Sequence, residues 1–371
     1  MPPPRPPSRS LPAAVEVRTP CRLHLGMLSF GVREIRSFGG VGVMIDRPGV
    51  LLRVERSDRL NARGPLAERA VAFAEACGRA WGIEPACGIE VALVPRSHAG
   101  LGSGTQLGLA VAAGVRHLFL REPVEDAPSA APGGESLEPA EQTWTFDTSD
   151  AIALARAVGR GRRSCVGVYG FSRGGLIMEG GRLPPDGPED DATRDFSPMV
   201  ARVRLPSAWR CVVVTQRDAI GLHGAAEKQA FAALPPVPLE ISAELARIAV
   251  MDMLPAAVEG RFDEFSDAVF RYGLLAGKPF EPASSRLPHA GSTAELVELL
   301  GEVGVRGAAQ SSWGPTVMAC CRSLDAAAAL CERLESLGLG QQYETTIAQF
   351  DTEGAVLREL GSSQARGTGR P

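Results

Sequence analysis

The sequence has almost no lysine, since Lys228 and Lys278 are the only two among 39 basic residues in a chain of 371. Anions must therefore be bound chiefly by arginine, whose planar guanidinium donates paired hydrogen bonds to a phosphate. The formal net charge of −4 argues against a generally basic nucleic-acid-binding protein. Any anionic ligand must therefore meet a local cationic patch rather than a global field.

Several kinds of site and segment are also missing from the sequence. The eight cysteines form no C-x-x-C pair and mostly lie in apolar runs, which predicts buried, reduced thiols in a cytoplasmic protein. No group of His, Cys and Asp has metal-ligand spacing, and neither a G-x-S-x-G elbow nor a serine triad occurs. The sequence contains no run of 18 apolar residues, so it predicts no membrane span. The proline-rich N-terminus lacks the apolar core of a secretory signal.

The length suits two modest domains, and a hydrophobic content of 44% is ordinary for a globular protein. The Pro/Asp-rich stretch 183–198 is typical of a domain boundary. Residues 121–146 are rich in Pro, Ala, Gly and Glu, and they predict a mobile surface insertion. The predicted division is a disordered tail over 1–12, an N-terminal domain over 13–190, a C-terminal domain over 191–360 and a disordered tail over 361–371.

Hydrophobic periodicity predicts strands and helices in both halves, and hence an α+β or mixed α/β chain. Two strands are expected on either side of Asp46–Gly49. The stretch "CVGVYGF" (165–171) is interpreted as one strand of a hairpin that turns at Ser172–Gly174. Further strands are expected over 88–94, 209–216, 305–310, 316–321 and 342–350, and helices over 66–81, 105–119, 147–158, 224–233, 239–253, 261–275, 292–300 and 325–336.

The first candidate site is the stretch "HAGLGSGTQ" (98–106), which opens a predicted helix. Its glycines permit backbone conformations that bring several N–H groups together at a helix N-terminus, where the unpaired amides and the dipole favour a phosphate. The G-x-G-x-G spacing is neither a dinucleotide fingerprint nor a P-loop, and a flexible strand-to-helix turn is the alternative. The candidate phosphate-binding residues here are Gly100, Gly102, Ser103, Gly104, Thr105 and Gln106.

The second candidate site is "VGRGRRS" (158–164). Three guanidiniums within four positions suit a phosphate or pyrophosphate clamp, whereas an exposed basic turn paired with the acidic insertion is the alternative. Its candidate residues are Arg160, Arg162, Arg163 and Ser164.

The third is "TPCRLHLG", in which Arg22 and His24 alternate with leucines and therefore project from one face of a strand. This pattern predicts the lining of a site, and a solvent-facing edge strand is the alternative. His223 lies just before a predicted helix, and with Glu227 one turn later it is a candidate for proton transfer. Helix capping is the alternative for His223.

The fourth is "AAQSSWGPTVMACC", a polar loop between two apolar strands. Its tryptophan is a candidate for stacking on an aromatic ring, and a tryptophan packed near a turn is the alternative. The candidate residues for an aromatic substrate are Gln310, Ser311, Ser312, Trp313 and Gly314.

The order of these motifs resembles the GHMP kinase superfamily, named for galacto-, homoserine, mevalonate and phosphomevalonate kinases. Residues 95–105 read "PRSHAGLGSGT", which matches the P-x-x-x-G-L-G-S-S loop of those kinases except that Gly104 replaces the second serine. The late glycine-rich turn of the kinases is replaced by "GAAQSSWGPT". Together the motifs resemble a narrower, non-kinase branch, the β-ribofuranosylaminobenzene 5′-phosphate synthases, from about Val15 to Phe350.

This resemblance implies an S5-like N-terminal domain and a ferredoxin-like C-terminal domain in a cytoplasmic homodimer. It also implies the first committed step of tetrahydromethanopterin biosynthesis, in one-carbon metabolism. A 4-aminobenzoate or 4-hydroxybenzoate attacks phosphoribosyl pyrophosphate through its ring carbon, and CO₂ and pyrophosphate leave. Mg²⁺ would share the charge of the leaving group, and its ligands remain unassigned. The alternatives are an ATP-dependent small-molecule kinase and a non-catalytic regulator that binds a phosphorylated metabolite.

Overall fold

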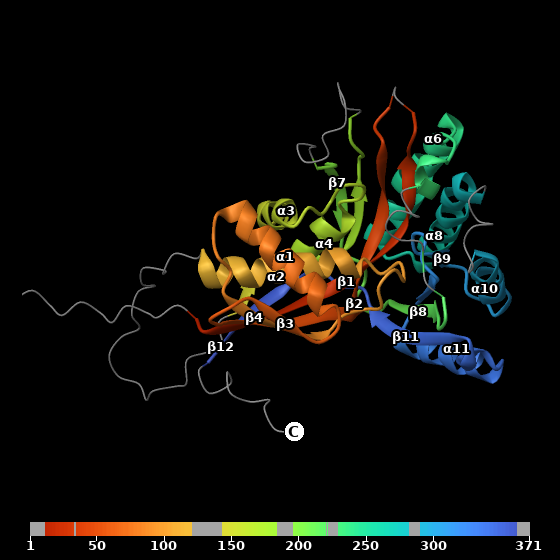
Figure 1. The fold of residues 1–371 in the computed structure, drawn as a ribbon. Helices are drawn as coiled ribbons and strands as arrows, with labels where there is room; N and C mark the ends of the chain where they lie inside the picture. Colours follow the sequence, from red (N-terminus) through yellow and green to blue (C-terminus); the bar gives the residue numbers. More distant parts are fainter. Residues whose placement is uncertain are drawn as a thin grey trace, which may run out of the picture.

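The structure is a computed structural model that describes residues 12–32, 35–120, 143–183, 196–219, 221, 229–281 and 290–361. The predictions for both terminal tails, for most of the 121–146 insertion and for His223 therefore lie outside the described residues. Two sheets, each with its own helices, lie next to each other in the molecule (Figure 1).

The larger sheet is built on two long antiparallel strands, β1 (Ala14–Ser29) and β2 (Phe38–Arg56). Its strand order is β3-β4-β2-β1-β12-β5, with β6 paired to β2 and β7 paired to β6. The β3–β4 pair is parallel and the other pairs are antiparallel. The remaining strands are β3 (Asn61–Arg63), β4 (Cys87–Leu93), β5 (Thr143–Thr145), β6 (Leu176–Glu179), β7 (Met199–Val203) and β12 (Val356–Leu360).

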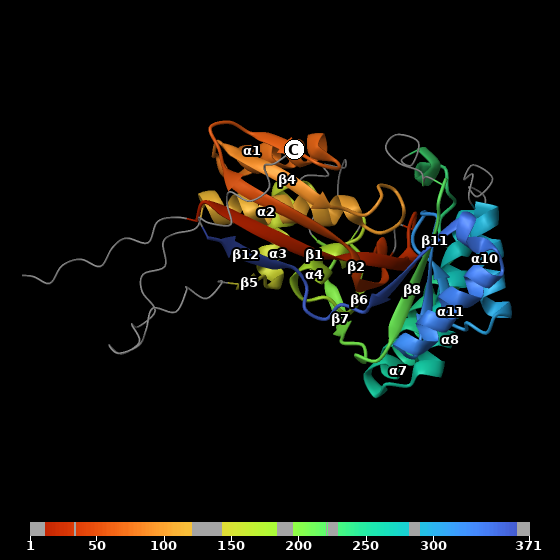
Figure 2. The ribbon, with the colours of Figure 1, turned by 90° about the horizontal axis from the view of Figure 1, so that it is seen from below.

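Four helices pack on one face of this sheet, as Figures 1 and 2 show. Alternation along β1 explains this packing. Val15 and Val17 point toward the helices and are fully buried, whereas the alternate residues Glu16 and Arg18 are not buried. The second helix is buried along most of its length because the other three flank it. The helices are α1 (Ala67–Trp81), α2 (Ser103–Phe119), α3 (Thr148–Ala157) and α4 (Val166–Arg173).

The smaller sheet has the antiparallel order β11-β8-β10-β9. Its strands are β8 (Arg210–Gln216), β9 (Ala308–Gln310), β10 (Thr316–Cys321) and β11 (Tyr343–Gln349). The helical segments around it are α6 (Leu239–Arg247), the π-helix η1 (Ile248–Met253), α7 (Leu254–Glu259), α8 (Phe262–Gly277), η2 (Lys278–Phe280), α10 (Ala290–Glu302), α11 (Leu324–Ser336) and η3 (Leu339–Gln341).

Both faces of the smaller sheet are covered, and one of them joins the two sheets. Val212 and Val214 pack with residues of α10 and α11, whereas Cys211 and Val213 face a core shared with α6, α8 and the larger sheet. Leu23 of β1 belongs to this shared core. The ends of β1 and β2 thus lie between the two sheets, where a site can draw residues from both halves of the chain.

The prediction of a strand over 165–171 was wrong, because these residues lead into and form helix α4. Every residue of this segment is buried, so tertiary packing overrides the strand preference of its valines. One glycine makes the packing possible, because a Cβ at Gly170 would collide with Met44 of β2.

The predicted break at Asp46–Gly49 is a bend inside a single strand, β2, where the register with β1 shifts between Thr19 and Cys21. The larger sheet also contains β7 and β12, two strands from beyond the predicted boundary at 183–198. The second of these runs beside the first strand of the chain, with Ala14 opposite Leu360. The chain therefore returns to the larger sheet after completing the smaller one.

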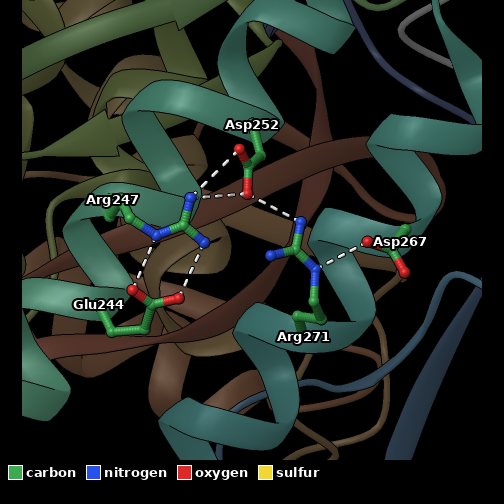
Figure 3. Close-up of polar contacts among 5 residues, drawn as sticks. All are labelled: Glu244, Arg247, Asp252, Asp267 and Arg271. Atoms are coloured by element: carbon green, nitrogen blue, oxygen red, sulfur yellow. Dashed lines mark hydrogen bonds and ion pairs between the residues drawn. The ribbon is translucent and has the colours of Figure 1, made fainter.

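An ion-pair network holds α6, η1 and α8 together (Figure 3). Arg247 donates to both carboxylate oxygens of Glu244, each at 2.8 Å. Asp252 of η1 accepts a hydrogen bond from Arg271 at 2.8 Å and lies 3.3 Å from Arg247. Arg271 also donates to Asp267 at 2.7 Å. Asp252 is therefore the carboxylate that connects the two arginines.

We expect Asp252→Asn to lower the free energy of unfolding by about 1 kcal/mol or less, because the partner arginines are over a third exposed and solvent screens them. The loss should shrink in high salt. Urea unfolding at low and high NaCl measures it. Asp263→Asn is the matched control, since it breaks only one exposed pair with Arg322 and should cost less. Equal losses from the two variants would contradict the network.

Candidate active site

A polar pocket of about 210 Å³ lies where the N-terminus of α2 meets β1 and the β9–β10 loop (311–315). We call it the anion pocket. None of its described lining residues carries a carboxylate. The lining consists of Arg22, Arg69, His98, Gly100, Leu101, Gly102, Ser103, Gly104, Thr105, Arg160, Ser312, Trp313 and Gly314.

The glycine-rich loop has its conformation because glycine is required at two points. Gly102 caps α2 with a φ of 68°, in the left-handed region that residues with a Cβ rarely adopt. A Cβ at Gly100 would collide with the carbonyl oxygen of Ser311. The first turn of α2 therefore presents amides that have no partner within the helix, such as those of Ser103 and Gly104, to the anion pocket. An anion fits this end of the helix.

Hydrogen bonds join the glycine-rich loop to β1 and to the β9–β10 loop. Arg22 N–H donates to the carbonyl of Leu101 at 3.2 Å. The Ser311 hydroxyl donates to the carbonyl of Gly100 at 2.8 Å and accepts from His24 N–H at 3.0 Å. Ser312 N–H donates to the carbonyl of His24 at 2.9 Å. The glycine-rich loop, β1 and the β9–β10 loop, all identified as candidate sites in the sequence, are thus connected by hydrogen bonds.

Two arginines besides Arg22 bring positive charge to the anion pocket. The guanidinium carbons of Arg69 and Arg160 lie 5.8 and 4.9 Å from the centre of the Phe73 ring. No carboxylate of the described residues forms an ion pair with either arginine. Burial, then the charges of Arg69 and Arg162, lower the pKa of Arg160 to about 10, and burial also lowers that of Arg69. Among the described residues, Arg69 and Arg160 therefore have no carboxylate to offset their charge.

Sequence reasoning missed Arg69, which lies in the first turn of α1 and belongs to no motif. A positive charge in the first turn of a helix interacts unfavourably with the helix dipole. This unfavourable placement was the one sequence feature that could have pointed to Arg69. Its guanidinium lies close to Gly104, since a Cβ on that glycine would be 2.5 Å from Nη2. The absence of a side chain at Gly104 thus makes room for Arg69.

The structure places the other predicted phosphate ligands outside the lining of the anion pocket. Gln106 is buried and donates to the carbonyl of Gly167 at 2.7 Å, which ties α2 to α4. Ser164 accepts a hydrogen bond from Val166 N–H at the start of α4. Arg163 lies over the Phe231 ring, 5.6 Å from its centre, and Arg162 is exposed. Of "GRGRRS", only Arg160 reaches the lining.

A second cavity, of about 510 Å³, adjoins the anion pocket and shares Ser312 and Trp313 with it. We call it the apolar cavity. It lies between β1, α8, η2 and α10, and its wall is mainly hydrophobic. Two carboxylates, Glu281 and Glu298, belong to the wall but are exposed, so they mark its solvent side. The main apolar lining residues are Leu25, Met27, Phe270, Leu274, Val297 and Ala309.

The two residues shared by the cavities have unusual environments. Trp313 packs edge-on against Phe280, with 5.3 Å between ring centres, and lies 6.2 Å from Phe231. Ser312 has a φ of 55°, although it is not glycine. Such conformations cost energy and concentrate at functional sites, and here the strained residue stands at the junction of the cavities.

His24 is among the residues that line the apolar cavity, and its imidazole Nε2 is a buried atom that water does not reach. The residue is 3% exposed, and its Nε2 has no hydrogen-bond partner among the described residues. Burial, and secondarily the charge of Arg22, hold the pKa of His24 well below its ordinary value. The imidazole is therefore neutral at neutral pH.

Comparison with known proteins identifies the family. The chain is 31% identical over 277 residues to β-ribofuranosylphenol 5′-phosphate synthase of Archaeoglobus fulgidus, covering 72% of this chain and 78% of that protein. The chain belongs to this synthase family. The synthase of Methanothermobacter thermautotrophicus is 28% identical over 315 residues, covering 81% of this chain and 87% of that protein. The family resemblance stated from the motifs is confirmed, and the chain is an enzyme of that family.

The fold expectation is confirmed as well. Residues 253–338 match the model for the GHMP kinases C terminal family. Mevalonate pyrophosphate decarboxylase from Streptococcus pyogenes superposes with a TM-score of 0.60 at 13% identity, covering 92% of this chain and 98% of that one. Homoserine kinase from Cytophaga hutchinsonii superposes with a TM-score of 0.58 at 15% identity, covering 94% of this chain and 98% of that one. No helix within the described ranges combines the length and apolar character needed to cross a membrane.

We expect Arg69→Ala to weaken the binding of inorganic pyrophosphate by about 10- to 100-fold, the usual loss for one hydrogen bond to a charged group. Isothermal titration calorimetry measures the affinity. Arg79→Ala is the matched control, because Arg79 is an exposed arginine of the same helix and should leave binding unchanged. Unaltered binding in Arg69→Ala would remove this residue from the anion pocket.

The buried His24 also predicts a pH dependence of stability. Below about pH 6.5 the unfolded chain binds a proton at His24 that the folded protein does not, so stability should fall with decreasing pH by up to about 1.4 kcal/mol per unit. His24→Leu should lose this contribution, which urea unfolding at pH 7 and 5.5 would measure. Burial raises the pKa of Asp351 to about 6, so this group changes the stability in the opposite direction as the pH falls. Asp351 is present in both the wild type and His24→Leu, so its contribution cancels in the comparison. An equal dependence of the unfolding free energy on pH in the wild type and in His24→Leu would contradict a neutral imidazole in the folded protein.

Proposed function

We propose that this enzyme joins phosphoribosyl pyrophosphate to a para-substituted benzoate, releasing CO₂ and pyrophosphate and forming a C-glycoside. It would thereby supply the first committed step of tetrahydromethanopterin biosynthesis. The observation that carries the proposal is the pair of cavities, one cationic and one apolar, that meet at Ser312 and Trp313. Such a pair suits a phosphorylated sugar on one side and an aromatic ring on the other.

The anion pocket supports the departure of pyrophosphate. As the bond from ribose C1 to pyrophosphate breaks, negative charge grows on the leaving group, and donors that are already in place stabilise it. The amides at the start of α2, with Arg69, Arg160 and Arg22, are those donors in the proposal. Arg162, Arg163 and Ser164 follow on the same loop and stay in the proposal as contacts at its edge.

The apolar cavity supports the positioning of the benzoate. A ring held there, with its carboxylate-bearing carbon at the junction, would face ribose C1 in the anion pocket, and positioning turns a poor carbon nucleophile into a competent one. Trp313, together with Gln310, Ser312 and Gly314, would form the wall against which the ring lies. Ser311 lines neither cavity, and its part in the proposal is to hold this loop in place through its hydrogen bonds. The relatives carry the name β-ribofuranosylphenol synthase, which supports 4-hydroxybenzoate as the first acid to test beside 4-aminobenzoate.

The residues of the anion pocket do not fit a protein-held Mg²⁺. The described part of the chain shows no group of three His, Cys, Asp or Glu that could hold a metal, and Mg²⁺ sites usually include carboxylates. The magnesium expected from the resemblance would therefore enter on the phosphates of the substrate. The steps proposed for this chain's own residues do not pass through it.

Two further expectations belong to this proposal. A cytoplasmic location is supported by the eight cysteines, all of which are free and seven of which are buried. A homodimer rests on the family resemblance alone, and sedimentation velocity would test it.

The test is an assay of the purified protein with Mg²⁺, phosphoribosyl pyrophosphate and carboxyl-labelled 4-hydroxybenzoate or 4-aminobenzoate. We expect labelled CO₂ and pyrophosphate to appear in equal amounts. Reactions that lack phosphoribosyl pyrophosphate, and reactions with unsubstituted benzoate, are the controls. The absence of CO₂ with both acids would overturn the proposal.

Two arms of the same assay separate the alternatives. ADP formed from ATP in the presence of an acceptor would favour a kinase. Tight binding of phosphoribosyl pyrophosphate without turnover would favour a regulator that only binds its ligand.

A further inference from the structure

We propose that the aromatic ring of Phe73 positions Arg69 and Arg160 in the anion pocket, taking the place that a carboxylate holds in a structural arginine cluster. Phe73 is a positioning residue, because it acts through the two arginines and does not line the pocket itself. The inference deepens the proposed function, and it rests on that function only for the identity of the anion as pyrophosphate.

The contacts of the two guanidiniums are the first argument. Their carbons lie 5.8 and 4.9 Å from the centre of the Phe73 ring, within the range of a cation–π interaction. Among the described residues, neither guanidinium has a hydrogen bond or an ion pair, and Nε of Arg160 is a buried atom without a partner. Within the described part of the chain, the ring is thus the attractive side-chain interaction that Arg69 and Arg160 have in common.

The seat of the ring is the second argument. Phe73 is 6% exposed and follows Arg69 by one turn of α1, which places both side chains on the same face of that helix. A Cβ at Gly108 of α2 would lie 3.2 Å from two carbons of the ring, so the ring lies close to the backbone of α2. Arg160 comes from the segment that follows α3. The ring therefore gathers guanidiniums from two elements beside the helix whose N-terminus forms the pocket.

The electrostatic character of the ring is the third argument. Arg69 and Arg160 carry like charges, and after burial the charge of Arg69 is the main cause that lowers the pKa of Arg160. A carboxylate between them would offset this repulsion, but it would also neutralise the pocket and repel an anion. The face of an aromatic ring attracts a guanidinium through its quadrupole and carries no net charge. Phe73 therefore holds both arginines and leaves their positive charge to the ligand.

The consequence for the site is preorganisation. An arginine side chain that moves freely loses rotamer freedom when it binds a phosphate, and this loss lowers the affinity. Arginines that already lie against the ring lose less, and donors that are in place before the reaction stabilise the charge that grows on the leaving group. Loss of the ring should therefore weaken anion binding although every charge of the pocket remains.

The experiment measures the affinity for inorganic pyrophosphate by isothermal titration calorimetry. Phenylalanine analogues with one, two and three ring fluorines are incorporated at position 73, because fluorine draws electron density from the face of the ring and changes its shape little. We expect the affinity to fall with each added fluorine. In Phe73→Leu it should fall by about three- to 30-fold, the range for a partly buried cation–π interaction.

Phe119 provides the matched control. The guanidinium carbon of Arg56 lies 4.7 Å from the centre of the Phe119 ring, but this pair is at the opposite end of α2 and lines neither cavity. The same fluorinated analogues at position 119, and Phe119→Leu, should leave the pyrophosphate affinity unchanged. A second comparison uses Arg160→Ala, in which fluorination at position 73 should have a smaller effect than in the wild type.

The outcomes separate positioning from packing. If Phe73→Leu binds more weakly but the fluorinated series shows equal affinities, Phe73 only packs, and the inference is overturned. Equal fluorine effects in the wild type and in Arg160→Ala, or a wild type that binds no pyrophosphate, would overturn it as well. If Phe73→Leu does not fold, the fluorinated series decides by itself. If the wild type releases no CO₂ yet its pyrophosphate affinity falls with fluorination, the proposed function fails and the positioning role stands.

Discussion

The candidate site depends on the seating of Ser311 between the two sheets. Its hydroxyl donates to the carbonyl of Gly100 and accepts from the amide of His24, so one side chain joins the glycine-rich loop, β1 and the β9–β10 loop. Ser311 is fully buried, and water does not compete for these bonds. Because Gly100 has no Cβ, the Ser311 backbone can lie against it, which leaves Ser312 and Trp313 between the two cavities.

The charge of the anion pocket follows from this construction. Arg69 and Arg160 are brought together beside the N-terminus of α2, and their mutual repulsion and partial burial oppose the charged state. A structural cluster would carry carboxylates to offset that cost, and none is present among the described lining residues. In the proposed reaction a phosphate or pyrophosphate would supply this charge, and binding would relieve the repulsion between the two arginines.

The apolar cavity offers a different environment from that of the anion pocket. Its wall is mainly hydrophobic, and in the proposed reaction it would remove the aromatic ring from water beside the arginine-lined anion pocket. A strained residue, Ser312, stands where the two environments meet. The fold is that of the GHMP kinases, but the wall that the β9–β10 loop provides is aromatic, with Trp313 against Phe280. The proposed function thus depends on the residues of this loop more than on the fold that holds it.

The sequence by itself determined the features whose causes are local. Glycine spacing identified the loop at the N-terminus of α2, and strand alternation put Arg22 and His24 on one face. Only the tertiary structure decided the rest. Helix α4 is buried on all sides, and it packs against β2 because Gly170 has no Cβ; strand preference does not register this packing. Arg69 reaches the site only once α1 packs beside α2, and the apolar cavity joins β1 to helices over 200 residues away, because packing brings together groups that no local pattern relates.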